Sequence, residues 1–205
     1  MTLPGFPAAT FFPPQFIKLV SSDAFPGANS TIPEDVQDGD IALGASWAIG
    51  SITNEGDWTK VAPIIGNTSG YLCGYYKVLT ESDRGVAYSL LNASTNRTHV
   101  RSIYRPSRGV WGPPESITSD FQPSLPYSNT ILGANVPCLV AFDAIRFGIA
   151  DITPSRPPKV TETATDNLSH LVWYFSRDAP NISVSYDNNT SASYGVLSYR
   201  IPLNL

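Results

Sequence analysis

The two histidines, His99 and His170, are the first residues to weigh for chemistry, because a histidine between a serine and an aspartate can act as the base of a nucleophilic site. Each lies in a segment whose residue pattern is typical of a β-strand. No G-x-S-x-G motif or comparable context accompanies either one. A histidine in such a strand is usually structural, either hydrogen-bonded in place or facing solvent. The sequence therefore predicts no catalytic residue.

Acidic residues cluster at two predicted turns, where carboxylates could bind a metal or act as paired acids. The clusters are Glu34, Asp35, Asp38 and Asp40, and then Glu81 and Asp83. Asp38 and Asp40 lack the further carboxylates of a Ca²⁺-binding loop, and they are interpreted as turn and cap residues. The two carboxylates of a glycosidase must lie about 5 to 10 Å apart, which sequence spacing cannot establish. H-E-x-x-H, paired C-x-x-C, P-loop and G-x-G-x-x-G motifs are missing, so we predict no metal and no cofactor.

Aromatic residues near turns are a third source of chemistry, because exposed Trp and Tyr rings can stack on sugar rings. Those in or near predicted turns are Trp58, Trp111, Tyr127, Tyr186 and Tyr194, whereas Trp47 and Trp173 lie in predicted strands and are expected in the core. We expect Trp111 to be the best candidate for an exposed contact residue, with Tyr127 as a second interface residue. A loop tryptophan also commonly covers the edge of a core or fills a subunit interface, and these alternatives stay open.

Composition limits the classes of partner. Charged residues make up 15% of the chain, against about 25% in an average soluble domain, while 42% are hydrophobic and 11% aromatic. The net charge is -4 and no run of Lys or Arg occurs, so we predict no binding to nucleic acid or to an anionic membrane. Prolines interrupt the N-terminus and no apolar run reaches about 18 residues, so we expect neither a secretory signal nor a transmembrane segment.

The two cysteines, Cys73 and Cys138, both lie in apolar segments that are predicted to be strands. We expect them to be small buried thiols in a chain made in a reducing cytoplasm. The sequence alone leaves open whether they approach each other.

The elements that must position these residues are predicted to be β-strands. In QDGDIALGASWAI, an Asp38-Gly39 turn leads into a segment whose side chains alternate between large and small. One face carries Ile41, Leu43, Ala45, Trp47 and Ile49, and the other carries Ala42, Gly44, Ser46 and Ala48. We expect the large face to enter the core and the small face to let another sheet or chain approach closely.

Similar segments recur along the whole chain. Predicted strands cover 16–20, 70–79, 85–91, 98–105, 138–147, 159–164, 170–176, 182–187 and 195–203. Helical spacing of apolar residues is weak, and Gly, Pro, Asn and Asp separate the segments. The predicted fold class is all-β, an antiparallel β-sandwich that is jelly-roll-like.

Two segments lack the strand pattern. Residues 1–16 form a proline-interrupted, apolar arm that carries Phe6, Phe11, Phe12 and Phe16. A solvated tail seldom carries so many phenylalanines, so we expect this extended arm to lie on its own domain or on a neighbouring subunit.

The second segment is the polar, proline-punctuated stretch 106–137, which is too long for an ordinary connection. Loops of this length are usually functional. We therefore predict a single β-sandwich domain over 17–205, in which 106–137 is a long loop excursion that makes contacts together with the arm.

Three quoted segments carry a family resemblance: VQDGDIALGASWAI, NEGDWTKVAPI and GYLCGYYKVLTESDRGVAYSLL. Taken in order, they resemble a pattern in structural proteins of tailed bacteriophages and prophages, and PPKVTETATDNLSHLVWYFS with ISVSYD looks like its companion segment. The resemblance implies a jelly-roll-like virion component, such as a head decoration protein, a head fibre or spike, or a tail-associated protein. It supplies no catalytic residues.

The sequence therefore predicts a non-enzymatic structural protein of a tailed-phage virion, made in the host cytoplasm. We expect it to be homo-oligomeric and to contact capsid or tail subunits through residues 1–16 and 106–137. The alternative is a carbohydrate- or receptor-binding module on the same scaffold, in which Trp111 and neighbouring tyrosines bind a host surface glycan. An enzyme, most plausibly a glycan hydrolase, is the third reading.

Overall fold

The computed structural model describes residues 16–26, 30–54, 57–63, 65–67, 70–88, 91–121, 127–145, 152–164, 168–186 and 195–205. Nearly all regular structure in these residues is β-strand, beside one 3-10 turn, η1 (Glu81–Asp83). The predicted all-β, antiparallel sandwich is therefore confirmed. Among the described residues, no helix has the length and hydropathy needed to cross a membrane.

Sheet I is built from the first half of the chain. Its strands follow the order β1 (Ile17–Pro26), β8 (Leu91–Pro106), β3 (Ile41–Asn54), β6 (Gly70–Val78) and β4 (Thr59–Lys60), and β5 (Ile65–Asn67) also pairs with β6. The long strands β3 and β8 pair at its centre, with register shifts around Ile49. Because β1 is an edge strand, the N-terminal arm joins the domain at the edge of sheet I.

Sheet II is built from the second half. Its strands follow the order β10 (Glu115–Phe121), β17 (Gly195–Asn204), β12 (Cys138–Ile145), β15 (Leu168–Phe175) and β14 (Val160–Ala164), and β9 (Val110–Trp111) also pairs with β17. The C-terminal strand thus lies inside the sheet, between β10 and β12.

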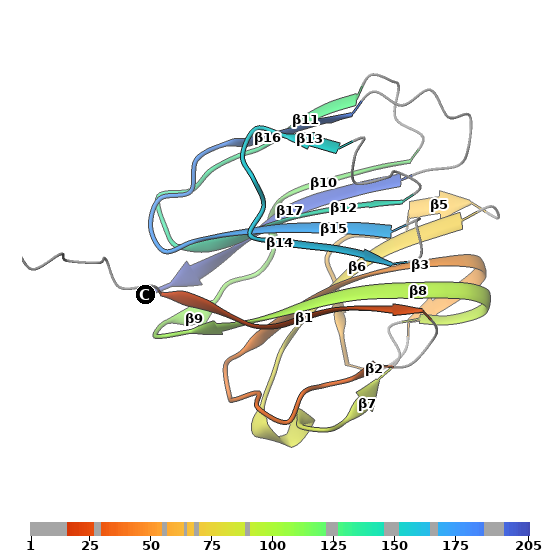
Figure 1. The fold of residues 1–205 in the computed structure, drawn as a ribbon, viewed down its shortest axis with the longest axis horizontal. Helices are drawn as coiled ribbons and strands as arrows, with labels where there is room; N and C mark the ends of the chain where they lie inside the picture. The colour runs from red at the N-terminus through yellow and green to blue at the C-terminus, as the bar shows by residue number, and fades with distance from the viewer. Residues whose placement is uncertain are drawn as a thin grey trace, which may run out of the picture.

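Two smaller sheets cover the outer faces, so the molecule has four layers (Figure 1). The first consists of β11 (Tyr127–Ile131), β16 (Ile182–Tyr186) and β13 (Ile152–Pro154), and it lies above sheet II in the view of Figure 1. The second consists of β2 (Ser30–Thr31) and β7 (Ala87–Tyr88), and it lies below sheet I. Each main sheet therefore has one face toward the other sheet and one face toward its own cover.

Strand β3 shows how the alternating sequence serves both faces of sheet I. Ile41, Leu43, Ala45 and Trp47 belong to the main core, whereas Ala42 and Ala48 belong to a second core with Trp58, Tyr75 and Ile103. The predicted division into a large and a small face is confirmed. Tyr88 of the covering layer packs against this second core.

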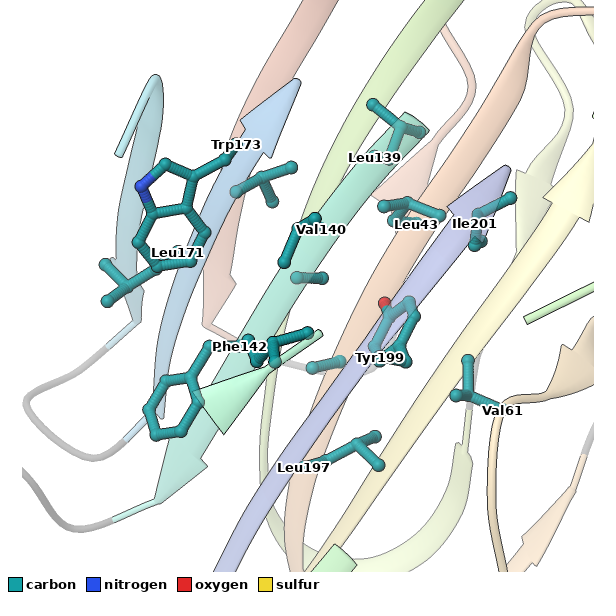
Figure 2. Packing of buried hydrophobic residues seen from close by; sticks show 14 of the residues in the cluster. Leu43, Val61, Leu139, Val140, Phe142, Leu171, Trp173, Leu197, Tyr199 and Ile201 are labelled. Atoms are coloured by element: carbon teal, nitrogen blue, oxygen red, sulfur yellow. The ribbon is translucent and has the colours of Figure 1, made fainter. Parts of the chain in front are cut away.

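The main core continues through sheet II. Figure 2 shows Leu43 of sheet I near Leu139, Tyr199 and Ile201 of sheet II, and Val140, Phe142, Leu171 and Trp173 belong to the same cluster. On β12, Leu139 and Val140 are neighbours and point to opposite faces, so the cluster embraces both faces of sheet II. Each fully buried side chain of this size contributes about 1.5–3 kcal/mol relative to exposure.

The predicted loop over 106–137 is wrong in the described residues, because this segment contains β9, β10 and β11. Strand β10 forms one edge of sheet II, and its side chains are exposed or half-exposed along its whole length. A strand with neither face buried shows no alternation of apolar and polar residues, so sequence pattern alone does not find it. Ser116, with φ of +50°, marks a further irregularity in its pairing with β17.

Several predicted boundaries also differ. The expected strand at 85–91 corresponds only to the short β7, and β8 begins at Leu91 rather than at residue 98. The turn before β3 is as predicted: Gly39 has φ of +87°, and the Asp40 amide donates to the Gln37 carbonyl over 3.1 Å. The positive φ explains why a glycine stands there.

Candidate functional site

The predicted arm residues fall mostly outside the described part of the chain: Phe6, Phe11 and Phe12 lie there, and Phe16 is the first residue described. Phe16 is half-buried against the main core. Its amide donates to Ser176 Oγ over 3.1 Å, and its carbonyl accepts from the Ser107 amide over 2.8 Å. The guanidinium carbon of Arg108 lies 4.6 Å from the centre of its ring. Since Ser107 follows β8 and Ser176 follows β15, Phe16 bridges the ends of sheets I and II.

Trp111 is buried, with 7% of its surface exposed, so the expectation of an exposed contact residue is wrong. Its strand β9 pairs with β17, and its Nε1 donates to the Gly39 carbonyl over 3.0 Å. Trp111 therefore covers the edge of the core, which was one of the alternatives left open by the sequence.

Tyr127 is also buried, at 9% exposure. Burial raises the pKa of Tyr127 to about 12, and the charge of Asp120 adds to the rise. Trp58 is buried too and stacks on Tyr88 with ring centres 4.9 Å apart. The structure therefore does not assemble these turn aromatics into an exposed platform. The side chain of Tyr186, and Tyr194 as a whole, lie outside the description.

His170 forms the arrangement with the strongest resemblance to a catalytic group. Its Nε2 lies 2.8 Å from Ser102 Oγ, and its Nδ1 lies 2.5 Å from Asp143 Oδ1. Ser102 comes from β8 of sheet I, whereas Asp143 and His170 face each other on β12 and β15 of sheet II. The order of serine, imidazole and carboxylate is the order found in serine hydrolases.

These three side chains, which we call the inter-sheet cluster, are fully buried. A nucleophile must reach its substrate, and Ser102 is 0% exposed, so in this structure the cluster connects the two sheets and has no contact with solvent. Asp143 Oδ2 has no hydrogen-bond partner among the described residues. Burial raises the pKa of neighbouring Tyr199 well above its usual value, and Asp143 adds to this rise. The tyrosine therefore stays neutral beside the carboxylate.

His99 has a similar role on the other face of sheet I. It is 1% exposed, and its Nδ1 lies 3.0 Å from Ser46 Oγ on the small face of β3. Both histidines are therefore buried and hydrogen-bonded. Sequence reasoning identified each histidine but not its partners, because those partners come from strands distant in the chain.

The acidic clusters stabilise the turns around β3, as predicted for Asp38 and Asp40. Asp40 is fully buried and accepts from the Gln37 amide and from both Nε and Nη2 of Arg105, each over 2.9 Å. Asp38 Oδ1 accepts from the Glu81 amide over 2.7 Å. No group of three His, Cys, Asp or Glu residues that could hold a metal ion occurs within the described ranges.

Asp83 and Lys77 form a partly buried ion pair at 2.6 Å, and Lys77 also contacts Asp57. Burial alone would raise the pKa of Asp83, but hydrogen bonds from Lys77 and Thr80 outweigh it and lower the pKa. Burial alone would lower the pKa of Lys77, and its two carboxylate partners raise it instead. Both charges are thus stabilised by the fold.

Cys73 and Cys138 are buried and do not pair. Burial raises the pKa of the Cys73 thiol to about 11 and that of the Cys138 thiol to about 12. The expectation of small buried thiols is confirmed, and neither has the low pKa of a reactive cysteine.

Several basic residues lie close in sequence to Phe16 or to its partner Ser176, contact Phe16, or line a cavity beside Phe175. Five described basic residues, Lys77, Arg84, Arg101, Arg105 and Arg200, pair with a carboxylate. The described side chains without an ion pair are those of Lys18, Lys60, Arg108, Arg156, Lys159 and Arg177. Lys18 follows Phe16 in the chain, Arg108 stacks on Phe16, and Arg177 follows its partner Ser176. Arg156 and Lys159 line a cavity with Phe175, which precedes Ser176. We call this group, without Lys60, the basic rim.

No protein-family model matches this chain, and no match was found among the curated proteins or the solved structures. The resemblance to phage structural proteins therefore stays a prediction.

Proposed function

We propose that this chain is a non-enzymatic structural protein of a tailed-phage virion, which docks on neighbouring copies or on other capsid or tail subunits through its N-terminal arm. The observation that carries the proposal is the attachment of Phe16. The arm residue that the structure describes is held by contacts from the ends of both main sheets. The preceding residues 1–15 therefore start from a fixed point on the domain.

An arm fixed at its base suits docking, because the domain that carries it need not rearrange when the arm binds a neighbour. Residues 1–15 contain Phe6, Phe11 and Phe12 and no charged side chain. Large apolar side chains without charges are typical of buried contacts between subunits. In a symmetric particle, many copies of one modest contact give a strong assembly.

The buried polar groups support a structural role as well. The residues with catalytic order, Ser102, Asp143 and His170, are sealed between the sheets at full burial. In that position they tie sheet I to sheet II. The resemblance of the strand segments to phage structural proteins points in the same direction.

The first experiment is light scattering of the full chain and of a chain lacking residues 1–15, at matched concentrations. We expect the full chain to form an oligomer and the truncated chain to be a monomer with an unchanged circular dichroism spectrum. A full chain that is monomeric across the concentration range would contradict docking between copies, and an unchanged oligomer after truncation would contradict the role of the arm.

The virion assignment needs a separate test in the phage or prophage that encodes the chain. A tagged full chain should co-sediment with purified particles, and the chain lacking residues 1–15 should remain in the soluble fraction. A tagged full chain that never enters particles would overturn the assignment. The variant Lys60→Ala, which changes a basic residue outside the basic rim, is the control and should be incorporated normally.

A further inference from the structure

A cavity of about 270 Å³ lies beside the last residues of β15. Its lining combines Trp173, Tyr174 and Phe175 with the segment Arg156, Pro157, Pro158 and Lys159, which leads into β14. Sites for drug-sized ligands occupy about 300–1,000 Å³, so this volume suits a ligand of a single ring. Aromatic residues and two basic residues thus line one small space.

The walls of this cavity are fixed by the fold. Trp173 Nε1 donates to the Arg156 carbonyl over 3.0 Å, and the Lys159 amide donates to the Val172 carbonyl over 2.8 Å. Between these two bonds, Pro157 and Pro158 each restrict their own φ. A site that is already shaped before binding loses less entropy when a ligand arrives.

The cations of the cavity have no partner within the described part of the chain. Arg156 and Lys159 are exposed and form no ion pair there, whereas Arg101, Arg105 and Arg200 all bond to carboxylates. Exposed cations cost little in folding. Both cations are therefore free to bind an external anion at this cavity, because guanidinium and ammonium groups form their strongest hydrogen bonds with ionised oxygens.

The chain's own arm fits this lining poorly. It joins the domain nearby, since Phe16 bonds to Ser176 directly after Phe175. Residues 1–15 carry no acidic side chain, so the arm would leave the charges of Arg156 and Lys159 unmatched. A ligand with both a ring and an anionic group matches the whole lining.

We propose that this cavity binds one acidic sugar residue, such as a uronic or sialic acid. The ring would lie against Phe175, which is half-buried and lies on the same face of β15 as Trp173, and Arg156 and Lys159 would bind its carboxylate. Aromatic side chains offer an apolar face to the carbon side of a sugar ring, and the planar guanidinium matches a carboxylate in two-point contact. This site goes beyond docking through the arm and does not depend on it.

The test is to titrate D-glucuronic acid and N-acetylneuraminic acid into the full chain and to monitor the protein's NMR signals. D-glucose and sodium acetate serve as matched probes, because glucose lacks the carboxylate and acetate lacks the ring. We expect saturable shifts at residues 156–159 and 173–175, with at least one of the two acidic sugars at millimolar affinity. Glucose and acetate should bind at least about tenfold more weakly, as expected for the loss of one charge-assisted contact.

The variants Arg156→Ala and Lys159→Ala should each weaken binding of the acidic sugar by about tenfold, and Lys60→Ala should leave it unchanged. Both lining cations are exposed, so these variants are expected to fold. A normal circular dichroism spectrum checks this for each variant.

Five results would overturn the proposal, the first four of which concern the probes. Those four are no saturable shift with either acidic sugar, equal binding of glucose, equal binding of acetate, or tighter binding of a glutamate-containing peptide. Binding that occurs only after residues 1–15 are removed would assign the cavity to the arm and would also overturn it. Failure of this test leaves the light-scattering result unchanged, so the two proposals can fail separately.

Discussion

The inter-sheet cluster and the basic rim differ in the burial of their polar side chains and in whether those side chains have partners. In the cluster, Ser102, Asp143 and His170 are fully buried, and each has a partner within hydrogen-bond distance. On the rim, Arg156 and Lys159 are exposed and pair with no carboxylate of the described chain. A buried charge needs a partner for the protein to fold, whereas an exposed one does not. The difference separates residues kept for stability from residues free to bind something else.

We expect the largest loss of stability from a substitution in the inter-sheet cluster. The variant Asp143→Ala leaves His170 buried beside an empty space and without its 2.5 Å partner. We expect the free energy of unfolding to fall by about 3–5 kcal/mol, as is typical when one member of a buried pair is removed. Urea unfolding measures this change. Asp143→Asn keeps an acceptor oxygen and should cost clearly less, and a loss below about 1 kcal/mol for Asp143→Ala would contradict the stabilising role.

The next effect compares the two histidine contacts. Ser102→Ala removes the 2.8 Å contact to His170 between the sheets, and Ser46→Ala removes the 3.0 Å contact to His99 on the outer face of sheet I. Each loss should cost about 1–3 kcal/mol, because a buried polar atom loses a partner. Thermal unfolding of both variants measures the costs side by side. No change in either melting temperature would show that the contact contributes nothing.

A smaller effect is expected at the base of the arm. Phe16→Ala removes a half-buried ring from the main core and from Arg108. We expect a loss of about 1 kcal/mol, below the value for a fully buried phenylalanine. At this chain length that corresponds to a fall in melting temperature of about 2–4 °C. An unchanged melting temperature would place Phe16 outside the stabilising contacts.

The ion pair of Lys77 and Asp83 is partly buried, so its burial is intermediate between that of the inter-sheet cluster and that of the basic rim. The pKa of Asp83 is lowered below 3.8, so its contribution is complete above about pH 4 and is lost as the pH falls through the folded-state value. Lys77→Met should cost up to about 1 kcal/mol at pH 7. The difference between the variant and the original chain should shrink in acid, and denaturant titrations from pH 7 down to pH 3 measure it. A difference that grows in acid would contradict the assignment.

We expect the smallest change in stability from substitutions in the basic rim. Arg156→Ala and Lys159→Ala should each change the free energy of unfolding by less than about 0.5 kcal/mol, as exposed residues without partners do. The same urea titration used for Asp143→Ala tests this. A large loss for either variant would show that the rim cations stabilise the fold and would remove the contrast with the cluster.

The sequence predicts some of these features because they depend on neighbouring residues only. The alternation from Ile41 to Ala48 assigns the two faces of β3, and Asp38-Gly39 marks the turn before it. The same method fails for β10, whose residues are exposed on both faces and so carry no periodic signal. It also fails for Trp111, because the sequence around a tryptophan that follows a turn does not show whether its ring is exposed or covers the edge of a core.

The sequence by itself determined that this protein is made of antiparallel strands, because side-chain alternation is a local property of the backbone. Only the tertiary structure decided that Ser102 meets His170 and Asp143, since the contact depends on the register of β12 against β15 and on the packing of one sheet against the other. The same holds for the cavity of Arg156 and Lys159, whose aromatic wall comes from a neighbouring strand. Contacts between distant segments arise from packing, and no short stretch of sequence encodes them.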